Sequence, residues 1–224
     1  MKNGKLIAII PVRKNSERIK YKNLKKFGDS SILEIKIKQL KKISLIDDII
    51  VNSDWNEALE LAHKLEVKTY KRDPIFASSN TTASDFYKNL AETLSNEYKY
   101  VMYAPPTSPL LKNETITNVI KYYFNNINTN DSIVTASNIK KFLWKDNQPI
   151  NYDIYNVPKS QDLPNIYALN HAIVINSRDF WINNKSLVGK NPIIYKISDI
   201  ESIDIDDPID FEIAEFLYLK YYIN

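Results

Sequence analysis

A cluster of cationic side chains follows the first apolar run of the chain, residues 6–11. Arginine and lysine form charge-assisted hydrogen bonds with phosphate oxygens, so such a loop suits a polyanion such as a triphosphate. A solvated basic surface is the alternative, but a position directly after a predicted strand favours ligand binding. The cations and their polar neighbours are Arg13, Lys14, Ser16, Arg18, Lys20, Lys22 and Asn23.

Glycine is missing from this loop. The three glycines of the chain are Gly4, Gly28 and Gly189, so neither G-x-G-x-x-G nor G-x-x-x-x-G-K-[ST] is present. This argues against a Rossmann dehydrogenase and against a P-loop kinase. Phosphates bound here would be held largely by side chains.

Two carboxylates, Asp204 and Asp206, stand two positions apart near the end of the chain. We predict a strand at 203–205, in which residues two apart point the same way, so both carboxylates would share one face. Such a pair favours a hard cation, and Mg²⁺ or Mn²⁺ held jointly with substrate phosphates fits it. The alternative is the acidic start of a helix at 208, which accounts for Asp207 and Asp210 but not for Asp204.

A proline-rich loop and a histidine give weaker signals. Residues 105–110, Pro-Pro-Thr-Ser-Pro-Leu, form a rigid loop in which Thr107 and Ser108 either contact a ligand or cap turns. His171 lies in a strand-like run at 168–176, where it either faces a pocket or is satisfied within a sheet. A Ser–His–Asp hydrolase has little support, because no G-x-S-x-G elbow exists.

Strand and helix patterns alternate along the chain. The alternation predicts an α/β fold, a doubly wound and mostly parallel sheet with helices on both faces. Ligands of such sheets bind beyond the carboxyl ends of the strands, where the loops described above should meet. The predicted strands are 6–11, 48–53, 67–70, 98–104 and 132–137, and the predicted helices are 32–43, 55–65, 84–94 and 113–124.

The alternation stops between about 138 and 192, where polar loops carry Phe142, Trp144, Phe180 and Trp181. We predict one domain over 1–224 with this segment as a small dimerisation arm, because exposed apolar groups usually need a partner surface. The chain has no cysteine, which excludes disulfides and thiolate chemistry, and a net charge of +3, too mild to indicate nucleic acid. No apolar run approaches the roughly 20 residues that span a bilayer, so we expect a cytoplasmic protein with no membrane partner.

Taken in order, these stretches resemble the acylneuraminate cytidylyltransferases, the CMP-sialic acid synthetases, over nearly the whole chain. The resemblance implies a nucleotide-diphospho-sugar transferase-like domain that forms a homodimer. It also implies metal-dependent transfer of CMP from CTP to an acidic sugar, with release of pyrophosphate. The matching motifs are Ile-Ile-Pro-Val-Arg-Lys-Asn-Ser at 9–16 with Lys22-Asn23, Val-Asn-Ser-Asp at 51–54, the loop from Arg72 to Ser84, Pro-Thr-Ser-Pro-Leu at 106–110 and Asp-Ile-Asp at 204–206.

The resemblance also implies roles for individual residues. By this resemblance, Arg13 and Lys22 bind the triphosphate and are catalytic, and Ser16 and Asn23 contact the nucleotide. The base is recognised by Arg72, Thr82, Ala83 and Ser84. Asp204 and Asp206 bind the metal, and Asp206 is also catalytic. The acceptor would meet Pro105, Thr107, Ser108, Lys159, Asn170 and His171.

The acceptor half departs from the family pattern. Members that use N-acetylneuraminate usually carry glutamine at the position of Pro105, lysine near that of Trp144 and arginine near that of Ser160. They also usually carry a small residue at the position of His171 and tyrosine at that of Val174. We therefore expect a different acidic acceptor, a modified nonulosonic acid or another 2-keto sugar acid.

Other functions fit parts of the pattern. A catalytically silent nucleotide-binding relative would not need Arg13, Lys22, Asp204 and Asp206 together. A sugar-phosphate nucleotidyltransferase using UTP or dTTP usually has the glycine-rich start that is missing here. A nucleotidyltransferase acting on a non-sugar acidic acceptor such as a phosphonate is the third alternative.

Overall fold

The computed structural model describes residues 3–78 and 80–223. The main strands are β1 (Lys5–Val12), β4 (Asp48–Ser53), β5 (Lys68–Lys71), β6 (Tyr98–Tyr103), β7 (Ser132–Ile139), β10 (Ile166–Ser177) and β11 (Pro192–Lys196). The α-helices are α1 (Ile32–Lys41), α2 (Asn56–Lys64), α3 (Ala83–Glu92), α4 (Asn113–Asn126), α5 (Arg178–Asn184) and α6 (Pro208–Tyr221). Shorter elements are β2 (Lys26–Phe27), β3 (Ser30–Ser31), β8 (Trp144–Lys145), β9 (Gln148–Pro149) and the 3₁₀ turns η1 (Pro74–Ala77) and η2 (Ser160–Asp162).

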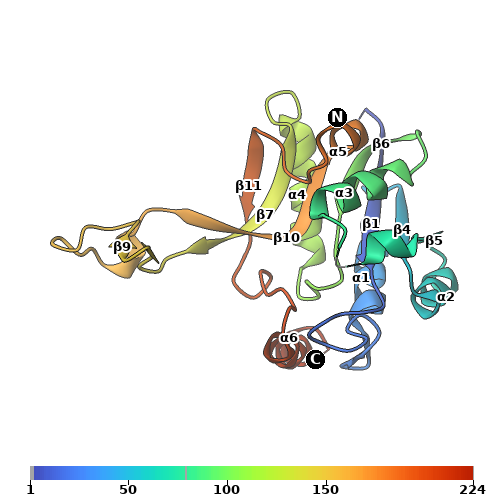
Figure 1. Cartoon of the computed structure of the whole chain (residues 1–224), viewed down its shortest axis with the longest axis horizontal. Coiled ribbons are helices and arrows are strands. Elements are labelled where there is room, and N and C mark those ends of the chain that lie inside the picture. The colour runs from blue at the N-terminus through green and yellow to red at the C-terminus, as the bar shows by residue number, and fades with distance from the viewer. Residues whose placement is uncertain (1–2, 79, 224) are drawn as a thin grey trace.

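The central sheet has the strand order β11-β7-β10-β6-β1-β4-β5. The residues of β1 alternate between its two faces. Leu6, Ala8 and Ile10 pack with residues of α1, α2 and α4, whereas Ile7 and Ile9 pack with residues of α3 and α5. Figure 1 shows α3 and α5 in front of the sheet and α4 behind it. Burial on both faces explains the continuous apolar run of β1. The predicted fold class, a mostly parallel sheet covered by helices on both faces, is confirmed.

The strand-like run at 168–176 belongs to β10, which pairs antiparallel with both β6 and β7. The predicted insertion at about 138–192 is therefore too wide, because β10 lies inside the sheet and α5 packs on it. Trp181 of α5 is fully buried and Phe180 is partly buried against the same cluster, so neither is an aromatic of a projecting segment. Residues 140–165, here called the arm, project away from the sheet and include β8 and β9 (Figure 1).

A third apolar cluster joins the start of the chain to α6, with Phe27, Ile205 and Phe211 as buried members. The predicted strand at 203–205 is wrong. These residues have no regular secondary structure, and the Ile205 amide donates to the Thr107 carbonyl oxygen at 2.9 Å. The neighbouring loop contains three prolines, which cannot donate the hydrogen bonds of a ladder. Within the described residues, each helix falls short of the length or apolar character needed to cross a membrane.

Candidate active site

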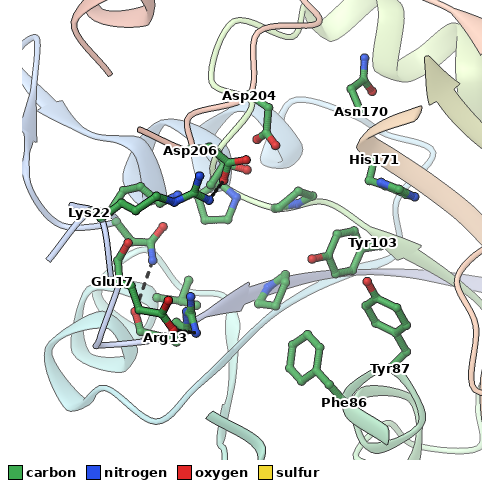
Figure 2. Close-up of a pocket in the computed structure, with 18 of the residues that line it drawn as sticks. Arg13, Glu17, Lys22, Phe86, Tyr87, Tyr103, Asn170, His171, Asp204 and Asp206 are labelled. Carbon is green, nitrogen blue, oxygen red and sulfur yellow. Dashed lines mark hydrogen bonds and ion pairs between the residues drawn. The ribbon is translucent and has the colours of Figure 1, made fainter. Parts of the chain in front are cut away.

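A pocket of about 380 Å³ opens beyond the carboxyl ends of β1 and β6. This is the edge at which open parallel sheets bind ligands, and the volume suits a small-molecule site. Figure 2 shows charged residues on one side of the pocket and aromatic and amide groups on the other. The lining residues are Pro11, Val12, Arg13, Ser16, Glu17, Arg18, Lys22, Asn23, Arg72, Phe86, Tyr87, Tyr103, Pro105, Pro106, Thr107, Asn170, His171, Asp204 and Asp206.

The basic loop and the two carboxylates meet on the charged side. Lys22 Nζ donates to the Ile205 carbonyl oxygen at 2.5 Å. Burial lowers the pKa of Lys22, while the negative charges of Asp206 and Asp204 act in the opposite direction. Arg18 forms an ion pair of 2.9 Å with Asp206. Segments about 180 residues apart in the chain thus build one site of alternating charge.

Asp204 is the more buried of the two carboxylates. Burial is the main reason that its pKa is raised, while the nearby Thr107 hydroxyl and the charge of Lys22 act to lower it. Its Oδ1 is buried without a hydrogen-bond partner among residues 3–78 and 80–223. A buried acceptor left unpaired is costly, so this oxygen is poised to accept a ligand.

Three potential metal ligands do not converge anywhere in the described part of the chain. Two carboxylates nevertheless suit Mg²⁺, which keeps several waters and is usually completed by substrate phosphates. The unpaired Oδ1 of Asp204 fits a cation of this kind, with Asp206 beside it.

Arg72 follows β5 and is buried in the pocket wall. Its Nε donates to Asn52 Oδ1 and its Nη2 to the Asn52 carbonyl oxygen, both at 2.6 Å. The guanidinium lies 4.8 Å from the centre of the Phe86 ring. Burial lowers the pKa of Arg72 to about 10, so the side chain remains charged at neutral pH. These contacts give the guanidinium a fixed orientation.

β10 is irregular where it reaches the pocket. Its register against β7 shifts between Leu169 and Val174, and His171 has a left-handed φ of 52°. Asn170 Oδ1 accepts from the Thr135 hydroxyl at 2.7 Å, while Asn170 Nδ2 is buried without a partner among the described residues. Non-glycine residues in this conformation are strained and cluster at functional sites. The irregularity places Asn170 and His171 at the pocket (Figure 2).

Most residues singled out in the sequence line this pocket: Arg13, Ser16, Lys22, Asn23, Arg72, Pro105, Thr107, Asn170, His171, Asp204 and Asp206. Ser108 and Lys159 do not. Ser108 is buried behind its loop, and Lys159 is exposed on the arm.

The predicted base-reading residues Thr82, Ala83 and Ser84 are also outside the lining. Thr82 instead caps α3 by accepting a hydrogen bond from the Asp85 amide at 3.1 Å, and all three side chains lie outside the buried core. Residue 79 of the same loop lies outside the described residues. Phe86 and Tyr87, less than one helical turn further on, line the pocket in their place.

Sequence reasoning gave no individual role to several lining residues. Arg18 was recognised only as one cation of the basic loop, and Glu17 lies beside it in the same loop. Tyr103 lies next to the end of the predicted strand at 98–104, at the ligand edge, which is a usable signal. Phe86 and Tyr87 lie in the first two turns of an amphipathic helix, where aromatic residues ordinarily belong to the core.

The matching family model, cytidylyltransferase, covers residues 7–223. Post-translational flagellin modification protein B of Campylobacter coli is 24% identical over 96% of this chain and 95% of its own length. N-acylneuraminate cytidylyltransferase of Escherichia coli is 24% identical over 94% of this chain but 51% of its own length, so the chain spans about half of that relative. Pseudaminic acid cytidylyltransferase of Campylobacter jejuni is 24% identical over 97% of both chains.

A solved structure of CMP:2-keto-3-deoxy-manno-octonic acid synthetase complexed with CTP shares the fold. It superposes with a TM-score of 0.73 at 12% identity, over 97% of this chain and 99% of its own. Fold and pocket together define an α/β protein that binds its ligand at the carboxyl edge of a mostly parallel sheet. The chain belongs to the cytidylyltransferase family and is an enzyme of the nucleotidyltransferase class.

Proposed function

We propose that the protein transfers CMP from CTP to an acidic sugar, with Mg²⁺ or Mn²⁺ as the metal, and releases pyrophosphate. The convergence of the basic loop on Asp204 and Asp206 in one pocket is the observation that carries this proposal. The relatives named as N-acylneuraminate and pseudaminic acid cytidylyltransferases support an acidic sugar as the acceptor.

Each part of the pocket has a role in such a transfer. Arg13, Arg18 and Lys22 bind the β- and γ-phosphates and stabilise the negative charge of the leaving pyrophosphate. Arg72 and Phe86 form the wall that receives the base. The acceptor hydroxyl attacks the α-phosphorus in line and releases its proton to solvent, and the bond from that phosphorus to the β-phosphate bridging oxygen breaks. Asp204 and Asp206 would hold the metal, which would supply further charge neutralisation at the phosphates.

The acceptor side of the pocket is rich in aromatic, amide and imidazole groups. It contains Tyr87, Tyr103, Pro105, Asn170 and His171. Burial lowers the pKa of His171, which favours a neutral imidazole at pH 7. A polar group of a substrate that is buried without a hydrogen-bond partner costs about 1–3 kcal/mol. We therefore propose a modified nonulosonic acid or another 2-keto sugar acid, rather than N-acetylneuraminate, as the acceptor.

The experiment is pyrophosphate release from CTP across a panel of acceptors. The panel holds N-acetylneuraminate, pseudaminic acid, N,N'-diacetyllegionaminic acid, 2-keto-3-deoxy-manno-octonic acid and simple phosphonates, and UTP replaces CTP as the control. We expect a modified acid to reach a kcat/KM above about 10⁴ M⁻¹s⁻¹ and N-acetylneuraminate to stay below it. The reverse order would overturn the acceptor assignment. CTP binding without turnover of any acceptor would indicate a silent nucleotide-binding relative.

We also propose a homodimer formed through the arm. Trp144 and Tyr155 of the arm are 54% and 93% exposed, which predicts a partner surface. Light scattering at micromolar concentration should give twice the 26.1 kDa of one chain. Trp144→Ser with Tyr155→Ser should shift the protein toward monomer, whereas Tyr122→Ser, 50% exposed on α4, should not. A fully active wild-type monomer would contradict the proposal.

Arg18→Gln should affect metal and nucleotide binding in opposite directions. Before CTP binds, Arg18 pairs with Asp206 and so competes with the metal for that carboxylate. After CTP binds, the proposed role of Arg18 is to contact a phosphate group. Exposed ion pairs contribute about 0–1 kcal/mol, so Mn²⁺ affinity without nucleotide should rise a few-fold. CTP affinity should fall about tenfold or more, the effect of removing a charge-assisted hydrogen bond. Electron paramagnetic resonance and calorimetric titrations measure the two constants. Lys20→Gln, in the same loop but outside the pocket lining, is the control, and a parallel change of both constants would refute the model.

A further inference from the structure

Lys36 is a fully buried lysine on α1. Its neighbours Ile35 and Ile37 belong to two apolar clusters, so its side chain lies in the interior of the protein. Burying an ammonium group is costly unless it is paired and hydrogen-bonded. Lys36 Nζ donates to the carbonyl oxygen of Ser108 at 2.9 Å.

A second side chain of α1 reaches the same loop. Gln39, three positions after Lys36, donates through Nε2 to the carbonyl oxygens of Pro109 at 2.6 Å and Leu111 at 3.1 Å. Residues three apart lie on one face of a helix, so α1 presents a pair of donors to the carbonyl groups of one loop. The loop is therefore anchored from beneath by side chains that do not line the pocket.

The other end of this loop contacts the carboxylate of the pocket. Thr107 precedes Ser108, and its hydroxyl is close enough to Asp204 to lower the pKa of that carboxyl. Its carbonyl oxygen accepts from the Ile205 amide at 2.9 Å. A contiguous path thus runs from Lys36 through Ser108 and Thr107 to Asp204. The charges of Lys36 and Asp204 also attract each other, since the field of Asp204 raises the pKa of Lys36 against the larger effect of burial.

We infer that Lys36 is a positioning residue of the active site, which holds the 107–108 segment so that Asp204 keeps the orientation needed to bind the metal. The inference rests on the proposed function, because it takes Asp204 as a metal ligand. Mutation of a residue that orients a metal ligand without touching the metal commonly lowers metal affinity or activity by about 10–100-fold. A mutation far from the reacting atoms that displaces a group of the site by about 1 Å can lower the rate by about 100-fold.

The test compares Lys36→Met with Lys38→Met. Methionine has nearly the shape of lysine but neither charge nor donor, and Lys38 lies on the exposed side of the same helix, paired with Glu34 at 2.7 Å. For Lys36→Met we expect a Mn²⁺ dissociation constant, measured by electron paramagnetic resonance with α,β-methylene-CTP bound, to rise about 10-fold or more. Turnover should fall by a similar factor, with KM for CTP nearly unchanged and a melting temperature no lower than that of the wild type. Lys38→Met should match the wild type.

Thr107→Val tests the same path from its other end. It should reproduce the loss of Mn²⁺ affinity, and the double variant should be little worse than either single variant, because both act through Asp204. Unchanged Mn²⁺ affinity in Lys36→Met, or losses that simply add in the double variant, would overturn the inference. So would a lower melting temperature with unchanged turnover per folded molecule. Absence of turnover in the wild type would count against the proposed function alone, because the Mn²⁺ constant still reports on Asp204.

Discussion

Asp204→Asn is expected to lower turnover by about 10²–10³-fold, the loss typical of removing one preorganised electrostatic contact from an active site. Asparagine keeps the shape of the side chain and an oxygen that can accept from Thr107, so the substitution removes mainly charge. Burial already raises the pKa of Asp204, and the uncharged side chain should be well tolerated by the fold. Pyrophosphate release gives the turnover, and calorimetry with CTP gives the affinity, which should change much less.

Asp207→Asn is the matched control for this substitution. Asp207 precedes α6, lies outside the pocket lining and pairs with Arg18 at 3.3 Å, and asparagine is as good a helix cap as aspartate. The control therefore removes a carboxylate charge beside Arg18 without removing a proposed metal ligand. Asp206→Asn should resemble Asp204→Asn, because the proposed metal uses both carboxylates. Activity of either pocket variant within a few-fold of wild type, or full wild-type activity in excess chelator, would contradict the two-carboxylate site.

The fold was predictable wherever local pattern and tertiary environment agree. β1 is buried on both faces, and its unbroken apolar run indicated that directly. α1 begins after Ser31, whose side chain accepts from the Glu34 amide at 3.3 Å, as the capping pattern predicted. α5 was missed because it has seven residues, too few to show a helical repeat. Trp181 was consequently placed on an exposed segment, although α5 packs it into the core.

The site was predictable in its charged half and less so in its acceptor half. Charged and proline-rich stretches form loops in many different tertiary environments, so Arg13, Lys22 and Thr107 could be found from residue types and position. The position of Asp204 was also found, although the strand proposed for it does not form. The segment at 82–84 lies outside the pocket lining, because Thr82 caps α3 and Ser84 is in its first turn. Local sequence does not distinguish these two uses of a threonine or serine.

Lys36 illustrates a signal that the sequence did contain. It lies three positions after Leu33 and four before Leu40, and both leucines are buried on α1. The helical period therefore places this lysine on the apolar face, where a charge is costly unless it has a hydrogen-bonding partner. Its partner, the Ser108 carbonyl group, was not predictable, because that contact joins residues 72 positions apart.

The stability of the protein should increase with pH above neutrality, and Lys36 should be the main cause. Burial lowers the pKa of Lys36 from 10.5 to about 7. Between these values the unfolded chain binds a proton that the native protein does not, so raising the pH favours the native state. The maximum slope is about 1.36 kcal/mol per pH unit for one group. Below about pH 7 both states carry the proton and the cost of the buried charge is fully present.

Lys36→Met should remove this dependence. Replacement of a buried charge by an apolar group is often neutral or stabilising, although the Ser108 carbonyl group loses its donor, at about 1–3 kcal/mol. The variant should therefore be at least as stable as the wild type near pH 7.5, and the wild type should gain roughly 2–3 kcal/mol on it by pH 9.5. Lys22 also has a lowered pKa, but it is present in both proteins and cancels in the difference. Urea unfolding at pH 7.5, 8.5 and 9.5 measures the two curves. Parallel curves would show that Lys36 does not titrate in this range. They would contradict the conclusion that Lys36 is a buried ammonium group whose charge destabilises the native state.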